Sequence, residues 1–232
     1  MKKLIIKYSI EFFVIVFSIS ASFFVENLRE DGEKEAKRKL IVNSLISEIE
    51  SNEKYLKETK EFYINSALVV NSFIKDSLSV KILNEYDNRM FSPANAFFTA
   101  LPFEPSNSIY NSLVNDGSLN LIKSPYLKAK IDELYKYSRV NISRMIDGET
   151  DAAKQADNMF INNYPKLYLR NFWNNYDDEK LLEDFVYAIN NDDRFKALMM
   201  QKYSFMQAKV RDISNYINRR DTLLIELKKV IE

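Results

Sequence analysis

Residues that commonly carry catalytic chemistry are scarce in this 232-residue chain, which contains no His and no Cys. Their absence excludes Ser-His-Asp and Cys-His catalysis, disulfides, and zinc sites that use His or thiolate ligands. Carboxylate sites for Mg²⁺ or Ca²⁺ remain chemically possible. No Asp-rich loop has EF-hand spacing, however, and no Gly-rich phosphate loop occurs. We therefore expect a protein that is not an enzyme and has no cofactor and no metal.

Two ionisable residues, Lys7 and Glu11, lie in the most apolar stretch of the chain. They are four residues apart, so they share one helix face and can pair. Ser18 and Ser22 have the same spacing, and such small side chains let a second helix approach closely. Glu11 could contact another chain, set the depth of the helix in a bilayer, or line an ion pathway. We favour the first two roles.

The apolar stretch from Leu4 to Val25 reaches about 33 Å as a helix, enough to cross a hydrocarbon layer of about 30 Å. A signal peptide cleaved after residues 20–22 is the alternative. The apolar run continues through Phe23 and Phe24, which favours a retained transmembrane anchor at residues 1–25. We expect the N-terminus in the cytoplasm and the following domain outside it, although positive charge on both flanks leaves the orientation open.

The balance of 33 basic and 33 acidic residues gives no overall field that would attract nucleic acid. No basic region with interleaved aromatic residues is present either. The partners that the sequence favours are the lipid bilayer and either further copies of the chain or a partner membrane protein.

Three Gly and five Pro residues are few for a β-protein, whose turns need them, and this composition favours long helices. We predict an all-α fold in which the transmembrane helix continues into an elongated antiparallel helical bundle, residues 26–232. A stalk helix over about 33–75 carries an apolar stripe interrupted by Asn52, Thr59 and Ser66. Gly32 is a possible soft point, and three Glu–Lys pairs at four-residue spacing support the helix, at residues 30/34, 33/37 and 35/39.

A final helix over about 192–231 has a stripe from Phe195 to Ile231 and a length of roughly 60 Å. Antiparallel packing on the stalk would return Lys228 and Lys229 toward the lipid headgroups. Between these long helices, residues 88–106 form an irregular loop rich in Pro and Phe. Such a loop either packs as a lid or binds a ligand, and its apolar content favours packing.

The most motif-like stretch runs from Ser108 to Ile122 and predicts a short helix that ends at Gly117 in a left-handed conformation. Ser124 and Pro125 then cap and begin the next helix. The residues that define the stretch are Ser108, Tyr110, Leu113, Gly117, Leu119 and Leu121.

These features resemble an uncharacterised family of single-pass bacterial membrane proteins. The resemblance covers about two-thirds of the chain. It rests on Glu11, the charged exit at residues 26–30, the box Ser108–Ile122, and Ile131–Tyr135. The family often has Trp at the membrane exit, where Leu28 stands here. The resemblance implies the architecture and a location in a bacterial inner membrane, and it implies no activity.

An aromatic cluster lies on both sides of Pro165 and could be a cage for a ligand or a hydrophobic cap on the end of the bundle, and we favour the cap. Its members are Tyr164, Tyr168, Phe172, Trp173 and Tyr176.

The sequence therefore favours a membrane-anchored, non-enzymatic interaction, sensory or scaffold module that acts as an oligomer or with a partner. A membrane-damaging effector that clusters its anchors and a structural subunit of an envelope assembly are the alternatives.

Overall fold

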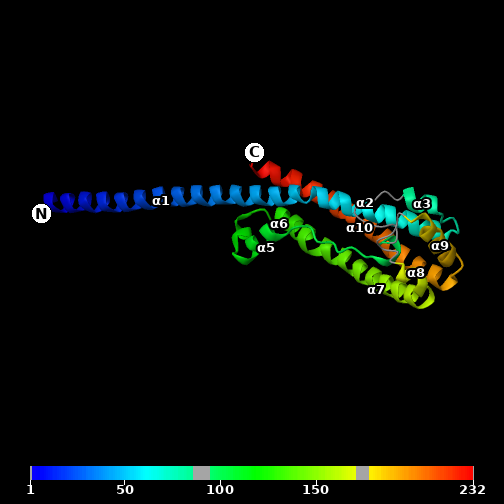
Figure 1. Ribbon diagram of the computed structural model, residues 1–232. Helices are drawn as coiled ribbons and strands as arrows, with labels where there is room; N and C mark the ends of the chain where they lie inside the picture. Colours follow the sequence, from blue (N-terminus) through cyan, green and yellow to red (C-terminus); the bar gives the residue numbers. More distant parts are fainter. Residues whose placement is uncertain (1, 86–94, 171–177, 232) are drawn as a thin grey trace.

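The computed structural model describes residues 2–85, 95–170 and 178–231, with side chains from residue 11 onward. All regular structure in these residues is helical, as the sequence predicts. The molecule is elongated, and the N-terminal part of helix α1 projects alone from the bundle (Figure 1).

Helix α1, Lys2–Ser51, and helix α2, Glu53–Ile74, follow one another along nearly the same line (Figure 1). Helix α1 continues unbroken through Gly32, the possible soft point. The interruption lies instead at Asn52, whose side chain bonds to the backbone of a distant segment described below. A polar residue with a fixed partner outside the helix, and not a flexible glycine, divides the stalk.

Helix α10, Asp193–Ile231, packs antiparallel along α2 and the second half of α1, and helix α7, Arg139–Asn163, covers its other side. The apolar stripes predicted on the stalk and on the final helix form the core of this bundle. Lys228 pairs with Glu50 at 2.8 Å. Glu50 lies 25 residues beyond Val25 in the sequence, about 37 Å along the helix, so Lys228 does not reach the headgroups of a bilayer around the apolar segment.

Shorter elements connect the long helices. Ser124 caps α6 through the backbone N–H of Leu127 at 3.3 Å, as predicted, and Asp192 caps α10 through that of Phe195 at 2.9 Å. An unforeseen π-helical turn, η2, joins α6 to α7. The connecting elements are α3 Val80–Glu85, α4 Asn95–Phe98, α5 Ser108–Asn115, η1 Ser118–Leu121, α6 Pro125–Asp132, η2 Glu133–Ser138, α8 Pro165–Leu169 and α9 Glu179–Asn190.

The exposed stalk between residues 26 and 39 carries ion pairs along its surface, but only one of the three predicted pairs forms. Lys34 bonds Glu30 at 3.1 Å. Arg29 forms an ion pair with Glu33 at 3.0 Å, and Arg38 forms one with Glu35. Arginine at three- or four-residue spacing presents a fork of donors that captures these carboxylates in place of the predicted lysines.

The end of the bundle far from the N-terminus is filled by phenylalanine rings. Phe97 lies at the centre, with edge-on contacts to Phe73 at 5.8 Å and to Phe185 at 5.6 Å between ring centroids. Phe195 is 5.7 Å from Phe73 and closes the cluster from α10. These aromatic contacts join α2, α4, α9 and α10 into one core.

Residues 99–107, the extended segment, cross the bundle without regular structure. Side chains of α2 and of the Asn52 junction satisfy the backbone of the extended segment, as buried peptide groups require. Asn52 donates to the Ser106 carbonyl at 2.9 Å and accepts from its N–H at 2.7 Å. Tyr55 bridges the Pro102 carbonyl and the Glu104 N–H, at 3.1 and 2.7 Å. The lid-like packing favoured for the irregular loop is therefore found in the described part, residues 95–106.

Candidate functional site

The apolar segment of α1 lies outside the bundle. From Glu11 to Leu28 every side chain is exposed, and Phe13 and Phe17 retain 69% and 75% of their accessible surface. This helix is long and apolar enough to span a membrane. Ser18 and Ser22 donate to the carbonyls of Val14 and Ser18 at 2.8 and 2.9 Å, so their hydroxyls are satisfied within the helix.

Ser18 and Ser22 lie on one face, as their spacing predicts. Lys7 lies in the part of α1 described by its backbone alone, so its predicted pairing with Glu11 is outside the described side chains.

The box Ser108–Ile122 folds as α5 followed by η1, and Gly117 adopts φ +74°, the predicted left-handed conformation. Tyr110 and Leu113 are buried, Leu119 and Leu121 are half-buried against the core, and Ser108 begins the helix. The ring of Tyr110 stacks on Tyr135 at 4.3 Å. The box therefore docks a short helix onto the bundle.

The N-terminus of α5 is held by a carboxylate from another helix. Glu48 of α1 is almost fully buried and accepts from the N–H of Ile109 at 2.6 Å and of Tyr110 at 3.4 Å. It also accepts from the Ser108 hydroxyl at 3.4 Å. A carboxylate placed at free N–H groups complements the positive end of the helix. Glu48 thus ties the box to α1.

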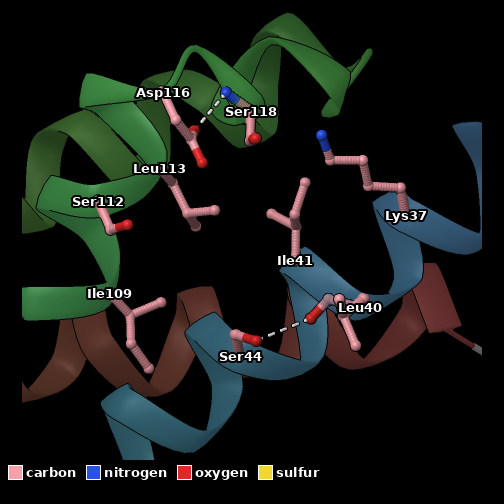
Figure 2. A pocket seen from close by; sticks show the side chains of 9 residues that line it. All are labelled: Lys37, Leu40, Ile41, Ser44, Ile109, Ser112, Leu113, Asp116 and Ser118. Carbon is pink, nitrogen blue, oxygen red and sulfur yellow. Dashed lines mark hydrogen bonds between the residues drawn. The ribbon is translucent and has the colours of Figure 1, made fainter.

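A cavity of about 270 Å³ lies between α1 and the box (Figure 2). Ile41, Ile109 and Leu113 supply apolar walls, and Lys37 and Asp116 stand at the polar end. Asp116 accepts from the N–H of Ser118 at 2.8 Å. This bond and the charge of Lys37 hold the pKa of Asp116 below its usual range. The lining residues are Lys37, Leu40, Ile41, Ser44, Ile109, Ser112, Leu113, Asp116 and Ser118.

A second polar site, the buried ionic cluster, lies inside the bundle and consists of Tyr63, Glu149, Lys202 and Lys209. The last three are fully buried. Lys209 contacts the carboxylate of Glu149, donates to the Tyr63 hydroxyl at 2.5 Å, and lies 3.8 Å from the centre of the Tyr63 ring. Lys202 lies 4.0 Å from Glu149. Helices α2, α7 and α10 therefore meet at the amine of Lys209.

The buried ionic cluster also holds residues 96–101 in place. Lys202 donates to the carbonyls of Ala96 and Thr99, both at 2.9 Å. The Tyr63 hydroxyl donates to the Leu101 carbonyl at 2.7 Å and accepts from the Leu101 N–H at 2.8 Å. Burial lowers the pKa of Lys202 to about 7, although the charge of Glu149 opposes the shift. Burial likewise lowers the pKa of Lys209 to about 8.

The predicted aromatic cluster can be followed only in part. Tyr164 and Tyr168 are half-buried and pack against the core. The Tyr164 hydroxyl bonds Asp192 at 2.8 Å, and its ring lies 5.5 Å from Phe160. These contacts fit a hydrophobic cap better than an open cage. Phe172, Trp173 and Tyr176 lie outside the described residues.

The sequence carried a signal for the buried ionic cluster. Lys202 and Lys209 continue the alternating four- and three-residue spacing of the buried positions Phe195, Met199, Met206 and Ile213. Glu149 stands one heptad after buried Ile142. Periodicity places all three in the core, while their charge suggests the surface, and the spacing was the better guide.

No group of three or more acidic side chains in the described ranges is arranged to hold a metal ion. Comparison of the chain with protein-family models, with curated proteins and with solved structures finds no match.

Proposed function

We propose that the chain is a single-pass protein of a bacterial inner membrane whose helical bundle is a non-enzymatic interaction module outside the cytoplasm. The observation that carries this proposal is the exposure of every apolar side chain between Phe12 and Val25. Large apolar surfaces of this kind mark contacts with a membrane or a partner. A lipid bilayer would cover all sides of this lone helix at once.

The bundle supports an interaction role because its most unusual ionisable groups are structural. Lys202 and Lys209 have lowered pKa values of the kind found at reactive sites. They are fully enclosed, and their hydrogen bonds go to the protein's own backbone and to Tyr63. This arrangement stabilises one shape of the bundle and leaves no surface at which these amines meet a substrate.

Membrane fractionation and N-terminal sequencing test the anchor. We expect the full chain in the carbonate-washed membrane pellet with its N-terminus intact. Replacing both Val14 and Phe17 by Arg should release the chain, because each central Arg costs about 2.5–3.5 kcal/mol on insertion scales. Arg at Ile64 and Leu68, exposed apolar residues on the bundle, is the matched control and should leave the chain in the pellet. Soluble wild-type chains that begin near Phe23 would contradict the proposal.

Protease added to intact spheroplasts tests the orientation. With the bundle outside the cytoplasm, the protease should reduce the chain to its anchor. Protection of the whole chain, with digestion only after lysis, would place the bundle in the cytoplasm and contradict that part of the proposal.

A further inference from the structure

The cavity between α1 and the box carries two opposite charges beside an apolar wall (Figure 2). Lys37 has no carboxylate within 4.0 Å among the described residues, because Glu33, its predicted partner, pairs with Arg29. Asp116 uses one carboxylate oxygen to accept from Ser118 and keeps the lowered pKa of an ionised group. One cation and one anion therefore face a single apolar cavity.

The size of the cavity limits its ligand. A volume of about 270 Å³ holds about nine molecules of liquid water at about 30 Å³ each. It is slightly smaller than the range of roughly 300–1,000 Å³ typical of drug-sized ligands and cofactors. A small metabolite with one short apolar group fits this volume, and the exposed side chains of Lys37, Leu40, Ser112 and Asp116 leave its outer side open to solvent.

We propose that this cavity binds a free α-amino acid with an aliphatic side chain, such as leucine. Lys37 receives its carboxylate, Asp116 receives its ammonium group, and Ile41, Ile109 and Leu113 surround the side chain. A ligand without charge would give neither the Lys37 ammonium group nor the second carboxylate oxygen of Asp116 an ionised partner. A zwitterion satisfies both at once, and oppositely charged hydrogen-bonding groups are stronger than neutral ones.

The proposal adds a small-molecule site to the interaction module and does not depend on it, because the cavity forms between α1 and α5 whether or not α1 lies in a bilayer. A ligand bound to both Lys37 and Asp116 would add a further connection between α1, which carries the apolar segment, and the box.

Isothermal titration of the full chain in detergent with L-leucine tests the site. Two analogues separate the charges: 4-methylpentanoate lacks the ammonium group, and 3-methylbutylamine lacks the carboxylate. We expect leucine to bind and each analogue to bind about tenfold or more weakly, the effect of losing one charged hydrogen bond. No heat of binding with leucine at concentrations up to about 10 mM would overturn the proposal, since even millimolar affinity is detectable there.

Two variants assign the roles. Lys37→Met should weaken binding of leucine and of 4-methylpentanoate and leave 3-methylbutylamine unaffected. Asp116→Asn, which keeps an oxygen acceptor for Ser118, should weaken leucine and the amine and leave 4-methylpentanoate unaffected. Lys39→Met, an exposed neighbour outside the cavity, is the control. Melting temperatures establish that each variant is folded, and wild-type binding by both Lys37→Met and Asp116→Asn would overturn the proposal.

Discussion

At the residue scale, the proton occupancy of Lys202 and Lys209 is coupled to folding. Both side chains are fully buried, with Glu149 from α7, Tyr63 from α2 and backbone carbonyls of residues 96 and 99 around them. An uncharged amine suits Lys202, since its two N–H groups match the two carbonyls that it contacts.

We predict that the free energy of unfolding rises with pH between about 7 and 10. The pKa of Lys202 is about 7 in the folded chain, against a usual value of 10.5, and that of Lys209 is about 8. In this window the unfolded chain binds more protons than the folded chain, so raising the pH favours folding, by up to about 1.4 kcal/mol per pH unit for each lysine. Below pH 7 both states are protonated and this slope ends. Denaturant titrations of the full chain in detergent at several pH values measure it.

Lys202→Met removes one of the two titrating groups and should reduce the slope, while Lys196→Met, at a half-buried residue of α10 that pairs with Asp76, should not. A wild-type stability that is flat or falls across this window would contradict the prediction.

The charge of Glu149, Lys202 and Lys209 would have placed all three wrongly on the surface. The heptad spacing of Lys202, Lys209 and Glu149 places them inside, but nothing in a linear sequence shows that Glu149 and both lysines converge. That convergence depends on how far α7 and α10 slide along each other, which is fixed by packing across the whole bundle. The cavity beside Lys37 was missed for the same reason, because its walls come from segments about 70 residues apart.

At the element scale, the box depends on the backbone at Gly117, where α5 ends and η1 begins with φ +74°. We predict that Gly117→Val lowers the free energy of unfolding by about 1–3 kcal/mol, because a β-branched residue is strained in the left-handed region. Chemical denaturation of the full chain measures the change.

Gly32→Val is the matched control. Gly32 lies in the exposed part of α1 with nothing within 4 Å of an added Cβ, so the change there should be within about 0.5 kcal/mol of wild type. Equal effects of the two substitutions would contradict the role of the Gly117 conformation.

Helix ends that depend on residues nearby in the sequence could be predicted. Irregular turns that depend on contacts with residues far away in the sequence could not. Gly117 and Ser124 sit at helix ends that the backbone of Gly117 and the side chain of Ser124 define, and the structure confirms both predictions. The break between α1 and α2, in contrast, lies at Asn52, whose side chain bonds the backbone of Ser106, 54 residues away in the sequence. The π-helical turn η2 is likewise braced from α10, where Arg219 bonds Ser138 at 2.8 Å and pairs with Glu133 at 3.1 Å.

At the scale of the whole molecule, an oligomer, one of the two assemblies that the sequence favours, would form through the lone part of α1. Glu11→Leu should leave membrane insertion intact or improve it, since a carboxylate at the centre of a helix costs about 2.5–3.5 kcal/mol on insertion scales. The same substitution should weaken self-association if Glu11 contacts another chain. Crosslinking in membranes and native mass in detergent measure this.

Glu11→Gln keeps hydrogen bonding and should give intermediate self-association. Wild-type assembly by Glu11→Leu would contradict a contact between chains and leave Glu11 as a residue that sets helix depth.

The all-α architecture and the antiparallel return of the last helix follow from periodicity and helix length, and the structure agrees. The position along α1 at which α10 ends could not be predicted in this way. Lys228 was expected at the headgroups, but the pairing of Lys228 with Glu50 fixes the offset between α1 and α10. A helix length gives no information about where its partner begins.

The unbroken helix from residue 11 to residue 51 also fixes a rotational phase between its two ends. Leu40, beside the cavity, stands 18 residues after Ser22, which is about five full turns. Leu40 therefore points to the same side of the rod as Ser22. The α5 lobe itself lies off this side, because Glu48, which holds the N-terminus of α5, stands 26 residues after Ser22, about 80° further round the helix. Two rods that met along the serine face would therefore carry their α5 lobes beside the contact and leave the exposed Leu40 side chains on the contact face.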